Sequence, residues 1–226
     1  SRPRRRQIVI NPVKTLFFDI ETLPAPPEKE PLLRDLFASR PGRSKTFDEF
    51  LKGTSLSGNW GRILCIGIAK SDEPIEVLTG DEITILREFW NRSMTVDRFV
   101  GHNILEFDLP FIGKRSVIND VQPSRLIPLQ RYQSELVFDT MRQWDHWASA
   151  PSTSLHQLAL ILGLQTSKQG IDGSQVYDFH QAGQDDEIYA YCARDVKLTR
   201  QVYHRLTFEH SRDVKSAVYS TVPPSN

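Results

Sequence analysis

A short apolar run near the start of the chain, interrupted by a carboxylate, constrains the fold more than any other feature. Residues 16–20 read LFFDI, and such a nearly continuous apolar run predicts a strand that is covered on both faces and lies centrally in its sheet. Asp19 stands inside this run, and Glu21 follows on the same face of the strand. Burying either carboxylate alone is unfavourable. Either the strand ends at Asp19 and both acids meet solvent, or the two acids belong to a metal site.

Strand and helix signals alternate along the rest of the chain. Further strands are predicted at 62–69, 75–78, 98–101 and 136–139, and the first two could form a meander with the strand at 16–20. Helices are predicted after Asp81, from about residue 106, after Ser154 and over 185–206. Strands followed by alternating strands and helices indicate an α/β fold with a mixed sheet. Trp144 and Trp147 are expected in the core or at a packed edge.

The composition is that of a folded protein, and it does not indicate a binding partner. The chain has 226 residues, 39% of them hydrophobic, which is enough for one sizeable core. Its 28 basic and 28 acidic residues give a formal net charge of zero, so a nucleic-acid partner has to be argued from a local site. Two cysteines without CxxC spacing, no apolar run of about 18 residues and no secretory h-region lead us to expect a cytoplasmic protein without membrane contact.

Three segments are expected to lie outside the core. Residues 1–12, rich in arginine, are expected to form a flexible basic arm, and 208–226 a C-terminal tail. A single domain then covers 13–207, with an inserted flap at 25–59. The flap contains six cations and ends near Trp60, a mixture that could follow a single nucleic-acid strand. Because the flap also contains acids, a solvated, partly disordered insertion is the other interpretation.

A third carboxylate lies on the inward face of the last helix. Helical spacing places Asp195 on the apolar stripe of 185–206, one turn after Tyr191. A carboxylate on a core stripe needs a partner. Arg194 or a backbone amide could supply it, with Tyr191 as ordinary core. Otherwise Asp195 belongs to a functional site.

A fourth carboxylate follows the end of a strand. Asp108 lies in the segment GHNILEFDLPF at 101–111, directly after the strand predicted at 98–101. Functional sites in open α/β sheets gather at the carboxyl ends of strands. Asp108 could instead be the N-cap of the helix that follows. His102, in the same segment, is expected to be structural rather than a metal ligand.

The four carboxylates together point to divalent metal ions. Asp19, Glu21, Asp108 and Asp195 can converge at one edge of the sheet, where like charges repel unless cations neutralise them. An all-oxygen set without a cysteine or histidine cluster suits Mg²⁺ or Mn²⁺ and disfavours zinc. Two such ions roughly 3.5 to 4 Å apart can activate a water and stabilise the leaving oxygen in phosphodiester hydrolysis.

Three short motifs resemble those of a known enzyme superfamily. FFDIETLP at 17–24, GHNILEFDLPF at 101–111 and YCARDV at 191–196 resemble, in this order, the three exonuclease motifs of the DEDD superfamily. Tyr191 is typical of the DEDDy branch, because the DEDDh branch carries histidine there. The chain resembles in particular the 3'-5' proofreading exonuclease domain of family-B DNA polymerases and the bacterial stand-alone proteins related to it. Further similarity lies in TSLHQLALILGL at 153–164 and KQGIDGSQVYDF at 168–179.

The resemblance implies a fold, two metal ions and a role for each site residue. The fold would be ribonuclease H-like, a mixed five-stranded sheet with helices on both faces. Asp19, Glu21 and Asp195 would hold one Mg²⁺ or Mn²⁺, and Asp19 with Asp108, the latter through water, would hold the second. Tyr191 would orient the attacking water, because a tyrosine with a pKa of about 10 is a poor base at neutral pH. From a chain of this length we expect no polymerase palm or fingers.

The resemblance also implies contacts to the substrate. The backbone of Thr22 and Leu23 would meet the terminal nucleotide, and Asn103 would hold the strand near the site. The side chains of Leu23 and Phe107 would wedge between bases or stack on them. The alternative is that both side chains belong to the core.

The leading hypothesis is a metal-dependent 3'-5' exonuclease that acts on the 3' ends of single-stranded DNA and releases nucleoside 5'-monophosphates. The same reaction on RNA is the enzymatic alternative, since no residue obviously reads a 2'-hydroxyl. A nucleic-acid-binding module without turnover is the alternative from another class, and the complete acidic set argues against it. A phosphatase with an aspartyl intermediate at Asp19 is a weaker rival, because Glu21 stands where its motif has a second aspartate.

Overall fold

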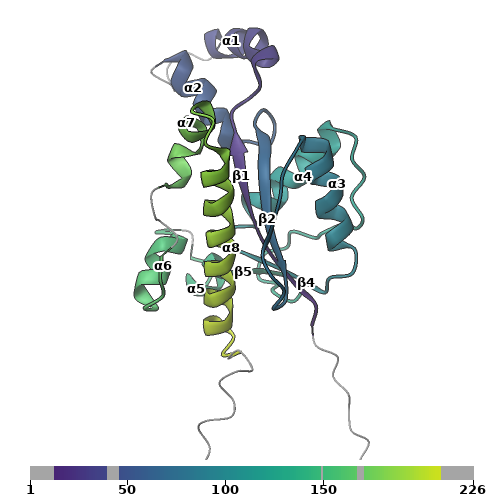
Figure 1. The fold of residues 1–226 in the computed structure, drawn as a ribbon, viewed down its shortest axis with the longest axis vertical. Helices are drawn as coiled ribbons and strands as arrows, with labels where there is room; N and C mark the ends of the chain where they lie inside the picture. The colour runs from purple at the N-terminus through teal and green to yellow at the C-terminus, as the bar shows by residue number, and fades with distance from the viewer. Residues whose placement is uncertain (1–12, 40–45, 149, 167–170, 210–226) are drawn as a thin grey trace, which may run out of the picture.

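Five strands form one mixed sheet with the acidic strand at its centre. The computed structural model describes residues 13–39, 46–148, 150–166 and 171–209. The strands are β1 (Thr15–Leu23), β2 (Arg62–Lys70), β3 (Glu76–Leu78), β4 (Arg98–Gly101) and β5 (Val137–Asp139). Their order is β3-β2-β1-β4-β5, with β2 antiparallel to β1 and β3, and β4 parallel to β1 and β5 (Figure 1). The central position of β1 and the meander β1-β2-β3 agree with the sequence prediction.

The described residues also form eight α-helices and three short 3-10 helices. The α-helices are α1 (Glu30–Ala38), α2 (Phe47–Gly53), α3 (Glu82–Ser93), α4 (Asp108–Ile118), α5 (Thr140–Trp144), α6 (Leu155–Ile161), α7 (Val176–Gln181) and α8 (Asp185–Leu206). The 3-10 helices are Pro27–Lys29, Thr54–Leu56 and Gly173–Gln175. Outside the flap, α5 and α7 are the described α-helices that the sequence does not predict, because helices of 5 and 6 residues are too short to show a helical period. None of the described helices could span a membrane.

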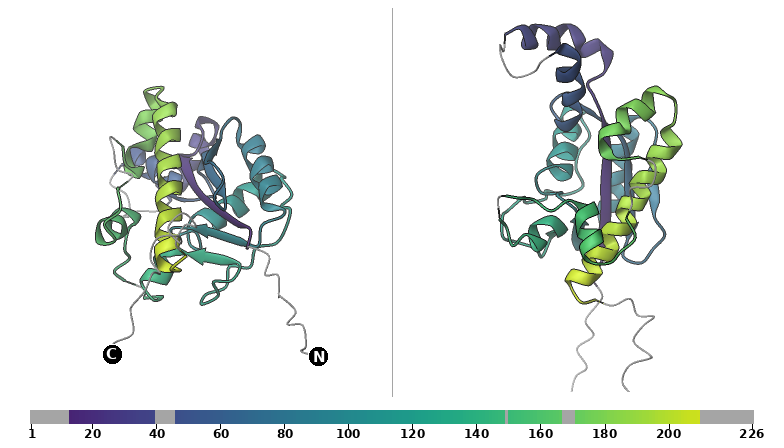
Figure 2. Two further views of the ribbon diagram at one scale, coloured as in Figure 1. Left: turned by 60° about the horizontal axis from the view of Figure 1, so that its bottom comes forward. Right: turned by 90° about the vertical axis from the view of Figure 1, so that its left-hand side faces the viewer.

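Helices cover both faces of the sheet. α8 packs on β1 and β2 from one side, and α3 packs on β2 from the other side and against α4. The right-hand view of Figure 2 shows the strands between α8 and the teal helices. α5, α6 and α7 contact α8 along its length, so α8 is the element that joins the carboxyl-terminal half to the sheet.

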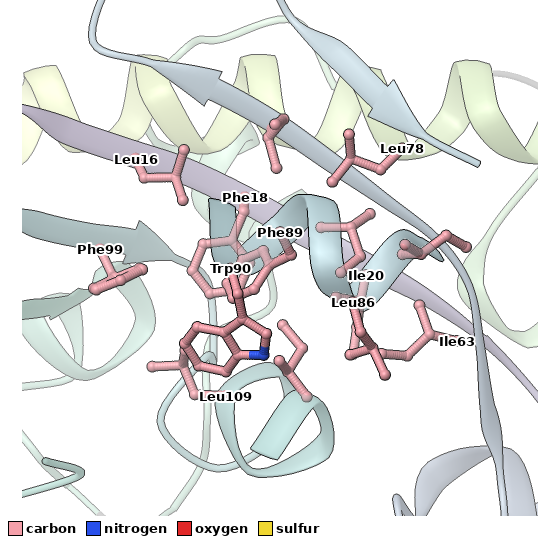
Figure 3. Close-up of a cluster of buried hydrophobic side chains, with 14 of the residues drawn as sticks. Leu16, Phe18, Ile20, Ile63, Leu78, Leu86, Phe89, Trp90, Phe99 and Leu109 are labelled. Atoms are coloured by element: carbon pink, nitrogen blue, oxygen red, sulfur yellow. The ribbon is translucent and has the colours of Figure 1, made fainter. Parts of the chain in front are cut away.

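Alternate side chains of β1 build the larger apolar core. Leu16, Phe18 and Ile20 are at most 5% exposed and point into this core together with side chains from α3 and α4 (Figure 3). The rings of Phe18 and Phe89 meet edge to face, with centroids 5.3 Å apart. Burial of these side chains supplies the main free energy for attaching α3 and α4 to the sheet.

Side-chain caps begin α3 and α6 where the sequence predicts them. The Asp81 carboxylate accepts a hydrogen bond from the Thr84 backbone N–H at 3.0 Å. Ser154 and Gln157 form a capping box at the start of α6. Gly163, with φ at 66°, follows the end of α6 in the left-handed conformation that favours glycine. These local signals explain why the two helices could be predicted closely.

The flap is helical in its described part and is attached to β1 at its base. The Thr22 hydroxyl donates to the Ser55 carbonyl at 2.8 Å. The Ala25 backbone N–H donates to the Thr54 hydroxyl oxygen, also at 2.8 Å. α1 and α2 extend beyond the end of the sheet, at the top of Figure 1. The flap therefore begins and ends beside the carboxyl end of β1, where the acids lie.

Two flap cations form ion pairs within the protein. Arg34 lies 3.3 Å from Glu30, one turn away on α1. Lys52 lies 3.1 Å from Asp178 of α7 and so connects the flap to the segment before α8. Several expectations fall outside the described residues: the basic arm at 1–12, the flap cations Arg40, Arg43 and Lys45, and the tail over 210–226.

Candidate active site

β1 carries Asp19 and Glu21 on one face of the sheet. The strand does not end at Asp19 but continues to Leu23, so both carboxylates stand within it. Glu21 is 7% exposed and Asp19 is half-buried. The pairing with β2 shifts register between Glu21 and Thr22, and such bulges redirect side chains beside active sites. The interpretation that the acids simply meet solvent at a strand end is therefore wrong.

A glycine in β2 lets α8 approach the sheet at the level of Asp19. Gly67 is the β2 residue opposite Asp19. A Cβ at Gly67 would lie 2.8 Å from Val196 Cγ2 and 3.0 Å from Cys192 Sγ, both on α8. The Gly67 backbone N–H donates to Cys192 Sγ at 3.2 Å. This close packing places Asp195, which is 8% exposed, over β1.

Asp108 joins the same site from the start of α4. The N-cap position of α4 is Phe107, without a side-chain cap, so Asp108 is the first helical residue and not the cap. Its carboxylate accepts a hydrogen bond from the Ile20 backbone N–H at 3.1 Å. Because Ile20 lies between Asp19 and Glu21 in the chain, this bond holds Asp108, 2% exposed, beside both acids.

Asp139 positions the loop before α4, a role that the sequence analysis missed. Its carboxylate accepts hydrogen bonds from the Asn103 N–H at 2.9 Å and the Leu105 N–H at 3.1 Å. It also accepts from the N–H groups of Met141 and Arg142, at 3.0 and 3.3 Å, and so caps α5. An aspartate at the end of a strand and directly before a helix is the signal that could have revealed it.

His102 ties this loop to a second segment. Its Nδ1 lies 2.9 Å from the Thr140 hydroxyl, and its Nε2 lies 3.0 Å from the Thr153 carbonyl. Burial lowers the pKa of His102, so the ring is neutral at neutral pH. With both ring nitrogens engaged, His102 has the structural role that we expect.

The structure brings the four carboxylates of the sequence prediction together. Burial raises the pKa of Asp19 well above its ordinary value, and the charges of Asp108, Asp195 and Glu21 raise it further. Burial and the neighbouring charges raise the pKa of Glu21 as well. For Asp108, burial raises the pKa to about 8. Carboxylate oxygens that destabilise one another in this way fit hard divalent cations, whose charge would relieve the repulsion.

Cys192, on α8, adds a thiol beside the acids that the sequence alone does not assign to the site. Its Sγ lies 3.8 Å from Asp19 Oδ2, and Asp19, Glu21 and Cys192 each offer an atom within 4.8 Å of the others. A side-chain hydrogen bond with Cys65, together with burial, raises the pKa of the Cys192 thiol well above its ordinary value. A thiol is a soft ligand, whereas Mg²⁺ and Mn²⁺ prefer carboxylate, carbonyl and water oxygens. The donors of the site therefore remain the carboxylate oxygens.

Tyr191 faces the acids from α8. It is 7% exposed and packs in an apolar cluster with Leu23 and Ile188. Burial raises the pKa of Tyr191, and the charge of Asp195 and a side-chain hydrogen bond with it raise the pKa further. The phenol therefore keeps its proton at neutral pH. It is suited to orienting a water and unsuited to removing a proton from one.

The residues expected to contact substrate differ in how accessible they are. Leu23 is 1% exposed, so its side chain belongs to the core and cannot stack on a base, which corrects the wedge interpretation. Phe107 is half-buried, with its ring centroid 5.6 Å from that of Phe111, and packs against the edge of the larger apolar core. Asn103 has φ at 63°, a conformation that asparagine tolerates better than most residues. Thr22 is 9% exposed and offers mainly its backbone.

Comparisons with known proteins agree with this geometry. Residues 62–221, more than half of the chain, match the family model described as predicted 3'-5' exonuclease related to the exonuclease domain of PolB. The matched range includes Asp108, Tyr191 and Asp195, whereas Asp19 and Glu21 precede it. An uncharacterized protein of Methanocaldococcus jannaschii is 22% identical over 162 residues, which cover 68% of this chain and 90% of that protein.

The fold has a solved counterpart. The family B DNA polymerase from the hyperthermophilic archaeon Pyrobaculum calidifontis superposes with a TM-score of 0.61 and 20% identity, over 87% of this chain. The chain spans 25% of that polymerase chain. The mixed five-stranded sheet with helices on both faces is the ribonuclease H-like fold that the motifs implied. The chain belongs to the family of predicted 3'-5' exonucleases related to the exonuclease domain of PolB.

Proposed function

We propose that the protein is a metal-dependent 3'-5' exonuclease that hydrolyses phosphodiester bonds at the 3' end of single-stranded DNA and releases nucleoside 5'-monophosphates. The observation that carries this proposal is the convergence of Asp19, Glu21, Asp108 and Asp195, whose burial and mutual repulsion raise the pKa of Asp19. Such a cluster opposes folding unless cations neutralise it. Membership of an exonuclease-related family supports the reaction class.

The four acids divide naturally between two metal sites. Asp19, Glu21 and Asp195 would hold one Mg²⁺ or Mn²⁺, and Asp19 together with Asp108 the other. Bound metal would lower the pKa of a water and neutralise the charge that develops on the scissile phosphate. Asp19 is the half-buried member, whereas the other three are at most 8% exposed. This difference supports a bridging role for Asp19 at the open side of the cluster.

Residues around the acids would hold the reacting groups in place. Tyr191, which keeps its proton, would position the attacking water through its hydroxyl group. The backbone of Thr22 and Leu23 would meet the terminal nucleotide, and the half-buried Phe107 would stack on its base. Asn103, fixed by Asp139, would hold the adjoining strand.

The decisive experiment follows the products from end-labelled oligonucleotides. Single-stranded DNA, single-stranded RNA and duplex DNA are incubated with the protein and Mg²⁺, Mn²⁺ or EDTA. We expect a ladder that shortens one nucleotide at a time from the 3' end of single-stranded DNA, with no cleavage in EDTA. Asp19→Asn should abolish the ladder, while Asp72→Asn, at a side chain that is 86% exposed, should not.

The same gel separates the alternatives. A ladder on RNA alone would keep the mechanism and replace the substrate by RNA. Tight binding of single strands without cleavage, by folded protein that also binds Mn²⁺, would favour a binding module over an enzyme. Cleavage that continues in EDTA would contradict the metal-dependent reaction.

A further inference from the structure

A pocket of about 290 Å³ lies beside the loop that carries Asp108. Its walls come from three segments that are distant in the sequence: the loop before α4, the connection from α4 to β5, and the turn after α5. The residues that line the pocket include Leu105, Glu106, Arg131, Tyr132, Arg142 and Trp147. Trp144 packs against the cluster between α6 and α8, as expected, but Trp147 lines this pocket instead of the core.

Two aromatic rings form one wall. The centroids of Tyr132 and Trp147 are 4.9 Å apart, with an angle of 48° between the ring planes. Tyr132 is 73% exposed and Trp147 is half-buried, so neither ring is committed to the core. A mutually supported aromatic pair that faces solvent provides a surface on which a further planar group can stack.

The backbone around this pair is held in an unfavourable conformation. Tyr132, His146 and Trp147 have φ values of 66°, 50° and 64°, which non-glycine residues rarely adopt. Each such residue is disfavoured by roughly 1 to 3 kcal/mol, and strain of this kind gathers at functional sites. Two of these residues, Tyr132 and Trp147, are the aromatic side chains that line the pocket, which agrees with a functional role for it.

The charged groups of the pocket favour an anionic ligand. Arg142 pairs with Glu106 and donates from Nη1 to the Ala148 carbonyl at 3.3 Å, so its guanidinium is fixed. Arg131 brings a second guanidinium to the same pocket. Two guanidinium groups against one carboxylate leave an excess of positive charge. Aromatic faces combined with cations are the features that bind single-stranded nucleic acid.

The pocket is coupled rigidly to the acids. Glu106 is two residues before Asp108, so their Cα atoms are at most about 7.6 Å apart. Asp139 accepts from the Leu105 N–H on one side and caps α5, which carries Arg142, on the other. A strand whose 3' end reaches Asp108 would therefore pass the pocket within a few nucleotides.

We propose that this pocket is a base-stacking subsite for the substrate strand, on the 5' side of the scissile phosphate. The proposal rests on the exonuclease function proposed above and extends it. One nucleobase stacks on Tyr132 and Trp147, and Arg131 contacts a neighbouring phosphate. Stacking uses the face of the base, so the subsite does not select a sequence. It gives longer strands an advantage over substrates that end at the scissile phosphate.

The test compares two substrates on the same variants. Decathymidylate reaches the pocket, whereas the p-nitrophenyl ester of thymidine 5'-monophosphate places only one nucleoside at the acids. Tyr132→Ala and Trp147→Ala should lower kcat/KM on decathymidylate roughly 5- to 150-fold, the range that stacking of one base supplies, and leave the ester unchanged. Trp147→Phe should restore most of the loss.

The chain offers a matched control for the aromatic variants. Phe208 is 82% exposed and has φ at 54°, so Phe208→Ala removes an exposed ring from the same backbone conformation after the end of α8. It should leave both substrates unchanged. If an aromatic variant does not fold, Arg131→Ala tests the subsite instead, because the Arg131 side chain is exposed. This variant should bind decathymidylate more weakly. The salt dependence of its binding should fall by the amount that about one phosphate contact contributes.

The outcomes separate this proposal from the one it rests on. Wild-type protein that cleaves neither substrate would contradict the exonuclease function, and the subsite with it. Wild-type protein that cleaves both, with aromatic and Arg131 variants equal to it on decathymidylate, would overturn the subsite alone. Equal losses on both substrates would also overturn it, because they would show damage to the acids rather than loss of a distant base contact.

Discussion

Neighbouring residues of β1 face opposite sides of the sheet, and the two sides differ in what they bury. On the side of α3, Leu16, Phe18 and Ile20 lie in an apolar cluster and are at most 5% exposed. On the side of α8, Asp19 and Glu21 occupy equivalent positions of the same strand, and Glu21 is 7% exposed. The side chains on the two faces of β1 therefore differ much more in polarity than in burial.

The apolar side chains of β1 stabilise the fold, whereas its buried carboxylates destabilise it. A fully buried apolar side chain gains about 1.5 to 3 kcal/mol on leaving water. A buried carboxylate loses hydration, and neighbouring carboxylates repel it. α8 approaches the acids only because Gly67 has no side chain. Packing alone does not explain this face, and the metal-dependent reaction proposed above would account for it.

The largest effect is expected from removing an acid on the α8 side. Asp19→Ala and Asp195→Ala should each lower kcat roughly 10³-fold or more, because both act through shared metal. The double variant should be little slower than either single variant, since residues that act as a unit are strongly non-additive. Single-turnover rates on labelled single-stranded DNA measure this. Losses that multiply would show that the two acids work independently.

The next prediction compares the change in stability when adjacent residues on opposite faces of β1 are replaced by alanine. Phe18→Ala should lower the free energy of unfolding by about 3 to 5 kcal/mol. At about 2 to 4 °C per kcal/mol, its melting temperature should fall by roughly 6 to 20 °C. Asp19→Ala should instead raise the melting temperature in EDTA, because it removes repulsion from the cluster. A fall for both variants would make Asp19 a structural residue.

Both faces of β1 could be predicted because each depends on the short-range period of a strand. The apolar run predicts burial, and the spacing of Asp19 and Glu21 predicts a shared face. The helical period placed Asp195 on the inward face of the last helix but left open whether it serves the core or a site. For Asp108, the rule that sites gather at the carboxyl ends of strands indicated a site and left the N-cap interpretation open. The expected roles of these residues came from the motif resemblance, because the spacing of residues alone does not indicate a role.

Other features depend on contacts between distant segments and left no local pattern. The four hydrogen bonds of Asp139 and the approach of Cys192 to Asp19 follow from how β5 and α8 meet the sheet. Leu23 is core because α8 covers it, although its position beside the acids suggested a base contact. The pocket beside Trp147 combines three segments, so the sequence could not indicate it.

A smaller loss is expected from Tyr191→Phe, which keeps the ring and removes the hydroxyl. If Tyr191 only positions the water, kcat should fall roughly 10- to 10³-fold. The Mn²⁺ affinity should not change, because the four carboxylates remain. Rates at saturating substrate and calorimetric titration with Mn²⁺ separate the two effects. A variant as fast as the wild type would make Tyr191 a core residue of the α8 side.

Metal should stabilise the protein through one face of β1 only. Ions that bind the native state add RT ln(1 + [M]/Kd), about 2.7 kcal/mol at a hundredfold excess over Kd. For a chain of this size the melting temperature should rise by roughly 5 to 11 °C. Phe18→Ala should keep this increase from its lower starting point, whereas Asp19→Asn should lose most of it. An unchanged melting curve of the wild type in millimolar Mn²⁺ would contradict the metal site.

The last prediction concerns how stability depends on pH. In the folded protein, burial raises the pKa of Asp108 to about 8, against about 3.9 for an aspartate in an unfolded chain. Between these values the folded state binds more protons than the unfolded state, so stability falls as pH rises. For one proton the slope is at most about 1.4 kcal/mol per pH unit. Below about pH 4 Asp108 contributes nothing, and above about pH 8 its penalty is complete.

Asp108→Asn removes this titration and keeps an oxygen that can accept from the Ile20 N–H. In EDTA, its stability advantage over the wild type should therefore grow between pH 5 and about pH 8 and then level off. Urea unfolding at several pH values measures the advantage. Phe18→Ala is the control, because an apolar side chain on the other face should give an offset that does not change with pH. An Asp108→Asn offset that is equally constant would show that Asp108 ionises normally and that its burial does not raise its pKa.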